Sequence, residues 1–393
     1  MDTDETIRIF TGFYRARGHQ PIGSSSLLSR PGDRVLFTSA GMHPLTPYLV
    51  GQPHPLGRRL TGIQRCLRTT DLDEVGDCSH LTVFQMLGSW SLGDYDGPQS
   101  QRWGLELLRD GFGLKPELLY ATVFGGDGQL GPDLAAADTW DELGLPVELL
   151  GPEDNWWSNG PTGPCGPDSE IHVWTGDGPP SGSPGTDERW LELWNHVTMR
   201  YERHPDGSLT PLSQPSVDTG MGLERLLMVS QHARCVYETD LFTPWRSVLP
   251  SLWRPDPESF RILTDHLRSA VIVIGDGVQP SNTGRGYVLR RLLRRALTAL
   301  WRGAGGSSLT LRDLPPDLVQ HTAGRFGQVI ESSQVTGVLA AEERKFRELV
   351  SRGRTLLRRL YPSGQLTGPD YEFLRDTHGL PPELVTDLLR EPR

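Results

Sequence analysis

Hydrophobic and polar positions follow one kind of pattern before about residue 240 and another kind after it. In the first part, helical spacing predicts an amphipathic helix over residues 4–17. Residues 62–93 alternate apolar and polar side chains around Gly76 and Gly88, a pattern typical of an antiparallel hairpin. The short apolar runs "DRVLFT" and "LYATVF" are bounded by turn residues and predict two further strands.

The middle of the chain is rich in glycine but also contains strand patterns. Residues 151–187 hold too many glycines for a helix and include the segment "NWWSNGPTGPCGPDSEI". The run "WLELWNHVTMRY" predicts a strand, and "SVDTGMGLERLL" predicts a strand that passes directly into a helix. We therefore expect residues 1–240 to form an α+β domain, built on an antiparallel sheet with flanking helices.

Residues 241–393 show helical spacing instead. In "SFRILTDHLRSAVIVIGDG" one helical stripe is apolar, and it consists of Ile262, Leu263, Leu267, Ala270, Val271 and Ile274. The segments "RGYVLRRLLRRALTALWR" and "VTGVLAAEERKFRELVSRGRTLLRRLY" predict a second helix and a third, longer one. We expect this part of the chain to be an all-helical domain.

Composition places the chain among ordinary globular proteins. Hydrophobic residues make up 36% of its 393 residues and charged residues 22%. No apolar run reaches membrane-spanning length, and the acidic start "MDTDETIRIF" is unlike a leader, so we expect a cytoplasmic protein without a membrane partner. The four cysteines form no CxxC pair, which argues against a disulfide framework or a zinc site. A net charge of −10 argues against a nucleic-acid-coating protein, although a local basic patch could bind one.

The segment "SVDTGMGLERLL" carries the first candidate chemistry. Gly220 and Gly222 leave the backbone bare, so a ligand can approach where a Cβ would block it. Arg225, in the first turn of the expected helix, could stack on a flat ring or bind a phosphate oxygen. A G-x-G is a weak signal by itself, and a structural turn before a core helix explains it equally well.

A second arginine lies at the predicted hairpin. Arg68 ends the segment "RCLR", while Gln85 and Trp90 belong to the return strand "VFQMLGSWSLGDY". On the face of a sheet, these three residues could neutralise an α-phosphate, contact the edge of a base and stack on the base. The alternative is a core tryptophan and a surface salt bridge.

Eight segments in chain order resemble alanyl-tRNA synthetases, which belong to class II of the aminoacyl-tRNA synthetases. They are "FTSAGM", "RCLR", "VFQMLGSWSLGDY", "NWWSNGPTGPCGPDSEI", "LWNHVTMRY", "SVDTGMGLER", "DHLRSAVIVIGDGVQPSNTGRGYVLRRLLRRA" and "LRDTHGLPPELV". In this resemblance the arginine hairpin corresponds to class II motif 2, and the glycine–arginine junction to motif 3. The resemblance covers nearly the entire chain. It implies ATP-dependent formation of alanyl-adenylate, followed by transfer of the alanyl group to an acceptor.

The resemblance also assigns roles at the nucleotide. Arg68 would bind the α-phosphate and Arg225 the far end of ATP, which makes them the catalytic arginines. Glu192 would bind Mg²⁺, although an exposed strand acid is the simpler explanation of this residue. Trp90 would stack under the adenine. The other contacts to ATP would come from Gln85 and Gly222.

Roles at the amino acid follow from the same resemblance. Asp218 would pair with the alanine ammonium, and Asn195 and Gly220 would lie beside the amino acid. A pocket large enough only for a methyl group would be walled by Met42, Trp157 and Val197. Without the surrounding motif, core packing alone would explain these three apolar residues.

The chain also departs from the resemblance in four places: Gln85 and Trp174 each replace a usual acid, and the other two departures are larger. It stops where the family continues into an editing domain with a zinc site, so we expect ATP and Mg²⁺ but no zinc and no editing. The loop "TTDLDEVGDCSHL" is shorter than in the family and has no lysine. In class II enzymes this loop lies between ATP and the acceptor end of the tRNA.

A basic helix face lies in the second part of the chain. Its spacing could follow a phosphate backbone, and in the family this region contacts the tRNA acceptor stem. The residues concerned are Asn282, Arg285, Arg290, Arg291, Arg294 and Arg295, together with the acid Asp376. A solvated or salt-bridged helix face is the alternative.

The acceptor of the alanyl group therefore has two readings. The rebuilt loop and the acidic charge favour a small molecule such as a nucleoside or another metabolite, and this is the reading we prefer. The alternative is a compact, editing-free alanine–tRNA ligase, which the basic helix supports. A catalytically dead binding module is a third possibility, and the sequence leaves the oligomeric state open.

Overall fold

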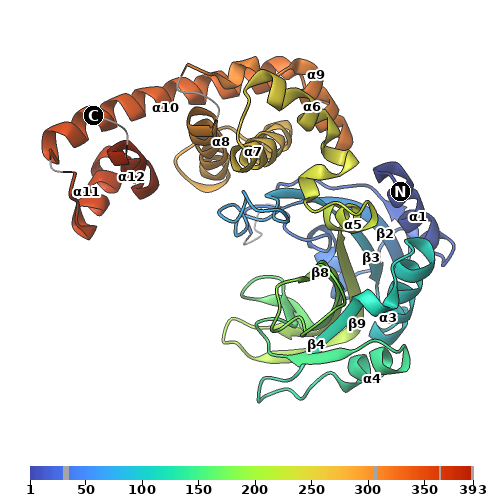
Figure 1. Ribbon diagram of the computed structural model, residues 1–393. Helices are drawn as coiled ribbons and strands as arrows, with labels where there is room; N and C mark the ends of the chain where they lie inside the picture. The colour runs from blue at the N-terminus through green and yellow to red at the C-terminus, as the bar shows by residue number, and fades with distance from the viewer. Residues whose placement is uncertain (30–34, 304–307, 363, 391–393) are drawn as a thin grey trace. The chain divides into compact units, whose positions relative to one another are not determined.

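The computed structural model describes residues 1–29, 35–303, 308–362 and 364–390. The chain divides into two compact units (Figure 1). The first unit comprises Met1–Val248 and Arg325–Gly327, and the second comprises Leu249–Gly324 and Gln328–Arg393. The short segment Arg325–Gly327 thus belongs to the first unit although it comes late in the chain. Local sequence patterns do not predict such an assignment.

A nine-stranded sheet forms the centre of the first unit, with the strand order β1-β2-β3-β9-β8-β7-β4-β5 and with β6 paired to β7. The strands are β1 (Gln20–Ile22), β2 (Arg59–Leu67), β3 (Val83–Ser91), β4 (Leu119–Phe124), β5 (Val147–Leu150), β6 (Trp156–Ser158), β7 (Gly163–Trp174), β8 (Trp190–Arg203) and β9 (Leu209–Gly222). Among the described strands, β1–β2 and β4–β5 are parallel pairs and the other pairs are antiparallel. The predicted α+β fold on a mainly antiparallel sheet is confirmed.

The three central strands bring distant residues of the sequence into register. On β3 and β9, Trp90 pairs with Asp218, and Gly88 pairs with Gly220. On β8 and β9, Asn195 pairs with Gly220, and Val197 with Asp218. Directly paired residues of an antiparallel sheet point to the same face. One face of β3, β9 and β8 therefore carries nearly all the strand residues that the sequence proposed for alanine.

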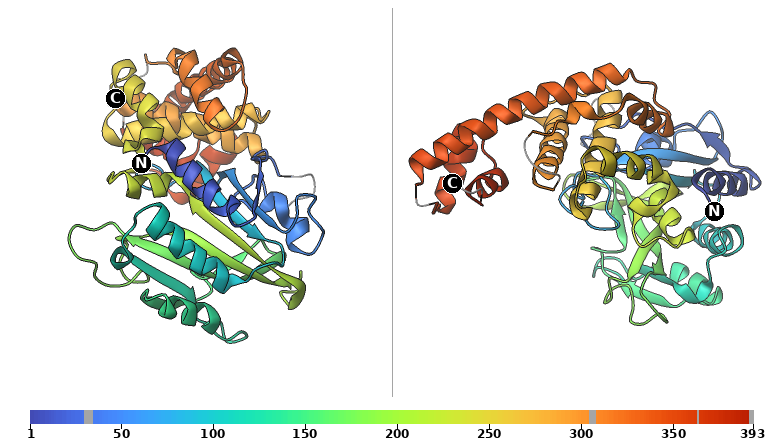
Figure 2. Two further views of the ribbon diagram at one scale, coloured as in Figure 1. Left: turned by 90° about the vertical axis from the view of Figure 1, so that its right-hand side faces the viewer. Right: turned by 45° about the horizontal axis from the view of Figure 1, so that its top comes forward.

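Helices cover the opposite face of this sheet (Figure 2). On β8, Trp194 and His196 alternate with the residues of the first face. Trp194 packs on Phe10 of α1, and His196 shares a hydrogen bond with the hydroxyl of Ser100 on α3. Because strand side chains alternate between faces, one run of sequence supplies both the core and the site. The helices of this unit are α1 (Thr3–Arg15), α2 (Thr46–Leu49), α3 (Gly97–Glu106), α4 (Leu134–Glu142) and α5 (Leu223–Ser230), with short turns of helix at His43–Leu45, Leu107–Gly111, Pro116–Leu118, Val236–Glu238 and Asp240–Phe242.

The strand predicted for "DRVLFT" is wrong in its described part. Residues 33 and 34 lie outside the described residues, and Phe37 forms only an isolated bridge with Leu28. The hydroxyl of Ser29 donates to the carbonyl of Val35, and the amide of Thr38 donates to Leu27. These bonds and the isolated bridge join the segments around Leu28 and Phe37 without forming a ladder, and the apolar Phe37 is buried.

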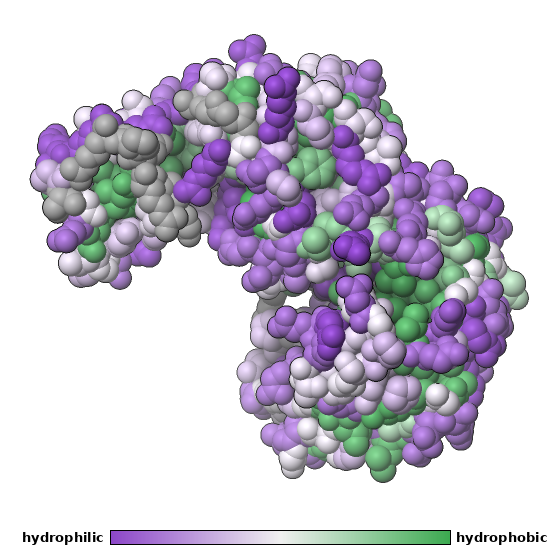
Figure 3. Space-filling model, in the orientation of Figure 1, coloured by the Kyte–Doolittle hydropathy of each residue, from purple (hydrophilic) through white to green (hydrophobic). Residues whose placement is uncertain are grey.

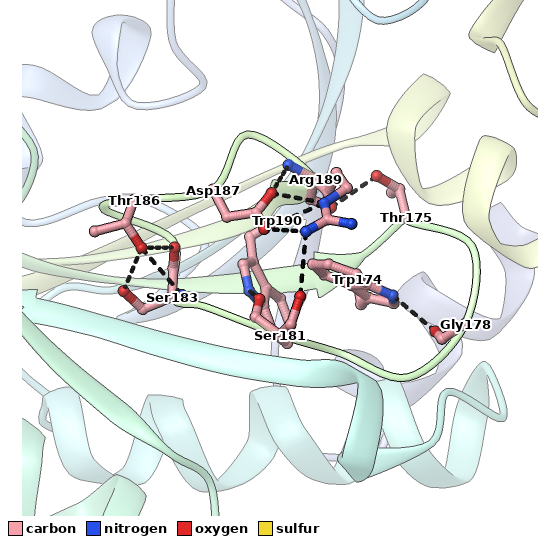
Figure 4. A network of polar contacts seen from close by, with 9 residues as sticks. All are labelled: Trp174, Thr175, Gly178, Ser181, Ser183, Thr186, Asp187, Arg189 and Trp190. Atoms are coloured by element: carbon pink, nitrogen blue, oxygen red, sulfur yellow. Dashed lines mark hydrogen bonds and ion pairs between the residues drawn. The ribbon is translucent and has the colours of Figure 1, made fainter.

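The glycine-rich region contains both β6 and β7, two strands that its composition did not predict. At Gly166 a Cβ would lie 2.0 Å from the carbonyl oxygen of Thr198, so only glycine lets β7 and β8 approach there. The loop that joins these strands is closed by its own side chains (Figure 4). Trp174 donates to the carbonyl of Gly178, and Arg189 lies 4.5 Å from the centre of the Trp174 ring.

The second unit is helical, as predicted. Its helices are α7 (Pro257–Gly275), α8 (Gly284–Gly303), α9 (Pro316–Arg325), α10 (Ser332–Leu360), α11 (Gly368–His378) and α12 (Pro382–Arg390), with a short turn at Leu311–Asp313; α6 (Thr243–Leu252) runs across the boundary between the units. The apolar stripe of α7 is buried, including Leu263, Leu267 and Ile274. Polar residues make up most of the face seen in Figure 3. Across the described parts of the chain, no helix combines the length and the apolar character needed to cross a bilayer.

Candidate functional site

A cavity opens on the first face of the central strands. Its lining comes from the β2–β3 hairpin, β6, β8, β9, the start of α5 and the segment before β2. The lining residues are Ala40, Arg68, Asp71, Ser79, His80, Leu81, Phe84, Met86, Trp157, Glu192, Leu193, Asn195, Val197, Asp218, Gly220, Gly222, Glu224 and Arg225. The structure thus brings together nine of the residues proposed for ATP and alanine. Among the proposed residues, Met42, Gln85 and Trp90 do not line the cavity.

An arginine and an aromatic ring lie side by side at the hairpin. The guanidinium carbon of Arg68 is 5.1 Å from the centre of the Phe84 ring. Phe84 is half-buried, so its ring offers a flat surface to the cavity. A base can stack on such a ring while the arginine binds a phosphate. The sequence analysis missed Phe84, although strand alternation puts it on the same face as Met86.

The stacking role predicted for Trp90 does not agree with the structure. The Trp90 side chain is only 1% exposed and leaves no free ring face for an adenine. Its indole nitrogen instead donates a hydrogen bond of 2.6 Å to Oδ1 of Asp218. Trp90 therefore acts at the proposed alanine end, and Phe84 is the aromatic residue at the proposed nucleotide end.

Two other predicted contacts need correction. Met42 is fully buried and packs in the core cluster that also contains Trp90 and Val197, so it lies behind the pocket wall rather than in it. The amide nitrogen of the Gln85 side chain donates to the carbonyl of Arg325, so this side chain does not face the cavity. Gln85 lies on the other face of β3 because it is one position away from Phe84.

Asp218 is the acid at the closed end of the cavity. It is 5% exposed, and burial raises its pKa to about 7, although the hydrogen bond from Trp90 opposes the rise. A buried carboxylate is stable when it meets a cation. The arrangement suits a small ligand that carries an ammonium group.

Asn195 faces the same space with a fixed orientation. Its amide nitrogen donates to Oδ2 of Asp168 at 3.2 Å and to Oε1 of Glu170 at 3.1 Å. Its amide oxygen is buried and has no partner among the described residues. Because the two carboxyl groups hold the nitrogen, the oxygen remains as the acceptor for a ligand donor. Burial raises the pKa of both Asp168 and Glu170, and the charge of the nearby Glu192 raises both further.

Arg225 and Glu192 form an ion pair at the open end of the cavity. Nη1 of Arg225 donates to Oε2 of Glu192 at 3.0 Å and to its carbonyl at 2.9 Å. Burial favours a higher pKa for Glu192, but the charges of Arg225 and Arg68 outweigh it and hold that pKa below its usual value. Within the described ranges, no group of three or more His, Cys, Asp or Glu side chains is arranged to hold a metal. One ionised carboxylate is nonetheless enough for Mg²⁺ when phosphates complete its shell.

The loop between β2 and β3 contributes residues that the sequence analysis did not assign. Nδ1 of His80 lies 2.6 Å from Oδ2 of Asp77, which orients the imidazole. The side chains of Asp71 and Ser79 line the cavity beside it. The position of His80 at the cavity suits a donor to an anionic ligand.

Glu224 was also missed as part of the site. It is 1% exposed, and its carboxylate accepts the backbone amide of Gln85 at 3.1 and 3.2 Å. This contact ties the first turn of α5 to β3. It fixes the position of the neighbouring Arg225, and the only sequence signal was the adjacency of the two residues.

Ion pairs neutralise part of the basic face of α8 in the second unit. Arg290 and Arg294 both pair with Oε1 of the buried Glu342 on α10, at 3.1 and 2.9 Å. Arg290 also contacts Asn282, Arg295 lies 3.3 Å from a ring nitrogen of His266, and the exposed Asp376 pairs with Arg375. Arg285 and Arg291 lie on the same helix. Part of this face therefore has a structural role, and its contact with nucleic acid stays a prediction.

Comparison with known proteins matches these features to one family. Residues 6–393 match the family described as tRNA synthetases class II (A). The alanine–tRNA ligase of Treponema pallidum (strain Nichols) is 40% identical over 97% of this chain and 67% of its own length. That of Rubrobacter xylanophilus is 39% identical over the whole chain and 47% of its own length, and that of Borrelia hermsii is 37% identical over the whole chain and 70% of its own length.

The chain therefore spans from about half to 70% of the length of these relatives. A solved histidyl-tRNA synthetase from S. aureus covers 60% of this chain at 14% identity, but its TM-score of 0.37 is too low to carry weight. The family match extends over both units, from α1 to the last residues. The chain belongs to the class II (A) tRNA synthetase family, and the relatives named above are alanine–tRNA ligases.

Proposed function

We propose that this protein activates L-alanine with ATP and transfers the alanyl group to tRNA. The observation that carries the proposal is the single cavity in which Asp218 and Asn195 lie together with Arg68, Phe84 and Arg225. The small-molecule acceptor that we preferred from the sequence has no support among the relatives, which are tRNA ligases. A shorter loop alone is too weak a reason to retain it.

The polar side chains at the closed end of the cavity suggest how alanine would bind. Asp218 would receive the ammonium, and the free amide oxygen of Asn195 would accept a second hydrogen bond from it. Trp157 and Val197 line the same cavity and would enclose the methyl group of alanine. Size alone would distinguish alanine from glycine or serine by only about 1–3 kcal/mol.

The nucleotide end uses the open part of the cavity. The adenine would stack on Phe84, the Arg68 guanidinium would bind the α-phosphate, and Arg225 would bind the distal phosphates. His80 could donate to the same phosphates. Glu192 would hold Mg²⁺, which supplies charge neutralisation to the phosphates when it is bound.

The chemistry needs no nucleophilic side chain. A carboxylate oxygen of alanine attacks the α-phosphorus of ATP, and pyrophosphate leaves. An acceptor hydroxyl then attacks the carbonyl carbon of alanyl-adenylate, and AMP leaves. The side chains align the reactants and neutralise charge on the phosphates as it develops.

Two assays on the same preparation test this proposal. Alanine-dependent exchange between ATP and pyrophosphate measures the activation step, and transfer of radiolabelled alanine to tRNA measures the second step. We expect both activities. Exchange without labelled tRNA would contradict the proposed acceptor, and absence of exchange would contradict alanine activation itself.

A further inference from the structure

The indole of Trp90 lies where it can control the ammonium site. Its nitrogen donates to Oδ1 of Asp218 at 2.6 Å, across the pairing of β3 with β9. Both side chains are buried, with exposures of 1% and 5%. A hydrogen bond from a neutral donor to a carboxylate is strong in such surroundings. The direction of the Asp218 carboxylate therefore depends on the direction of the ring.

Two glycines let the ring lie in this direction. A Cβ on Gly88, two positions earlier on β3, would lie 2.3 Å from Cη2 of Trp90. A Cβ on Gly41 would lie 2.8 Å from Cζ2 of the same ring. Any larger residue at either position would displace the indole. The bare backbone of these glycines thus serves the orientation of the tryptophan.

The ring lies between the alanine end and a second cavity of about 190 Å³, whose wall includes Trp90, Gly41, Tyr48 and Gln64. The glycines make room for the ring but offer no polar group that sets the direction of its N–H. The hydrogen bond to Asp218 supplies the remaining constraint, and each of the two side chains orients the other.

We propose that Trp90 is a positioning residue for alanine, which fixes and favours the ionised carboxylate of Asp218 through its indole N–H. This inference rests on the proposed alanine activation and adds a residue that touches neither ATP nor the reacting atoms. Its role is to prepare the acid that receives the ammonium. Removal of the indole N–H should therefore weaken alanine binding and leave ATP binding intact.

The role has a pH signature. Burial raises the pKa of Asp218 to about 7 and the bond from Trp90 lowers it, so loss of the bond raises it further. The KM for alanine should fall as pH rises through that pKa, because only the ionised acid pairs with the ammonium. Without the indole N–H, the fall should move to higher pH.

Other ionisable groups face Asp218 or the cavity around it. They are Cys66 and Arg68 of the β2 region, Asp71 and His80 of the loop between β2 and β3, Glu192 of β8, and Glu224 and Arg225 of α5. Arginines stay charged throughout, the pKa of Glu192 is held low, and burial raises the pKa of the Cys66 thiol. The wild-type profile and the variant profile contain these groups equally, so the difference between them reports on Asp218.

The test compares Trp90→Phe with the matched control Trp140→Phe. Trp140 is also fully buried, and its indole nitrogen donates to Ser169 Oγ at 2.6 Å, away from the cavity. In alanine-dependent pyrophosphate exchange, we expect Trp90→Phe to raise the KM for alanine about tenfold, with its pH midpoint about one unit higher. The KM for ATP should stay unchanged. Trp140→Phe should leave both KM values and the midpoint as in the wild type.

Each other outcome is decisive. An unchanged alanine KM and midpoint in a folded Trp90→Phe protein would overturn the proposal, as would an equal rise of both KM values. If Trp90→Phe does not fold by circular dichroism, Gly88→Ala tests the same idea by displacing the ring. An unchanged KM for alanine in a folded Gly88→Ala protein would then overturn the proposal. Loss of exchange in the wild type would instead contradict the proposed function.

Discussion

Single residues decide which end of the cavity binds which part of the ligand. The motifs correctly placed Arg68, Asn195, Asp218 and Arg225 around one space, because collinear segments of a family keep their places in its fold. They could not distinguish Phe84 from Trp90, since alternation puts both on one face of β3. The choice depends on Gly41, which comes from a separate segment and admits the indole.

Replacement of Phe84 tests the nucleotide end. We expect Phe84→Leu to raise the KM for ATP about tenfold, because stacking of a base on an aromatic ring contributes about 1–3 kcal/mol. The KM for alanine should change little. Phe84→Tyr keeps the ring and is the matched control. The measurement is pyrophosphate exchange at varied ATP, and an equal loss in both variants would contradict a stacking role.

The buried acid Asp168 gives a pH dependence of stability. Its pKa in the folded protein is raised to about 7 from an ordinary 3.8, so between these values the folded state holds a proton that the unfolded state releases. Its contribution is therefore most favourable below pH 4 and is lost as pH rises toward 7. Asp168→Asn should remove this slope. Denaturant unfolding at several pH values measures it, and parallel profiles for wild type and variant would refute it.

Buried histidines change the stability in the opposite direction as pH rises, so the pH dependence of the wild type alone does not isolate Asp168. Burial lowers the pKa of His172 to about 4 and that of His196 to about 3. These groups bind a proton more readily in the unfolded chain, so they make the folded state more stable as pH rises toward 6.5. Both histidines are present in wild type and in Asp168→Asn, and their contributions cancel in the difference.

At the scale of elements, spacing predicted the helices and the hairpin well and the irregular segments badly. The runs that became β4, β8 and α7 have clear periodicity, which fixes the element from local sequence. In the glycine-rich region, β6 and β7 are strands because neighbouring strands bond to them. Such pairing comes from distant segments and leaves little local pattern.

The ion pairs between α8 and α10 should contribute to the stability of the folded protein. Glu342 is 1% exposed and receives both Arg290 and Arg294, so Glu342→Gln would leave two arginines without their carboxylate. We expect a loss of about 2–3 kcal/mol in the free energy of unfolding, less than for a fully buried pair because the arginines are partly exposed. The exposed Glu348→Gln on the same helix is the control. Equal stability of the two variants in urea unfolding would contradict the assignment.

At the scale of the whole molecule, charge distinguishes the two steps of the proposed reaction. The chain carries a net charge of −10, so binding of tRNA must rely on local arginines rather than on overall attraction. The acceptor could not be settled from the sequence, because the shortened loop and the basic helix point to different answers. The relatives favour tRNA, and salt provides an independent test.

Transfer to tRNA should weaken with salt more steeply than alanine activation. Each phosphate that a protein neutralises releases counterions, so the affinity for nucleic acid falls steeply between about 50 and 200 mM salt. We expect the rate of pyrophosphate exchange to change little over this range. The KM for tRNA should rise several-fold or more. An insensitive KM for tRNA would argue against binding through phosphates.

The register of the central strands also has a consequence for how the protein is made. Trp90 and Asp218 lie 128 positions apart in the chain, and β9 must be synthesised before it can insert between β3 and β8. The β2–β3 hairpin can form early from local contacts, whereas the ammonium site depends on a late, long-range closure. In the proposed function, alanine and ATP can therefore bind only a chain whose sheet is complete. Their binding would stabilise that folded state against unfolding.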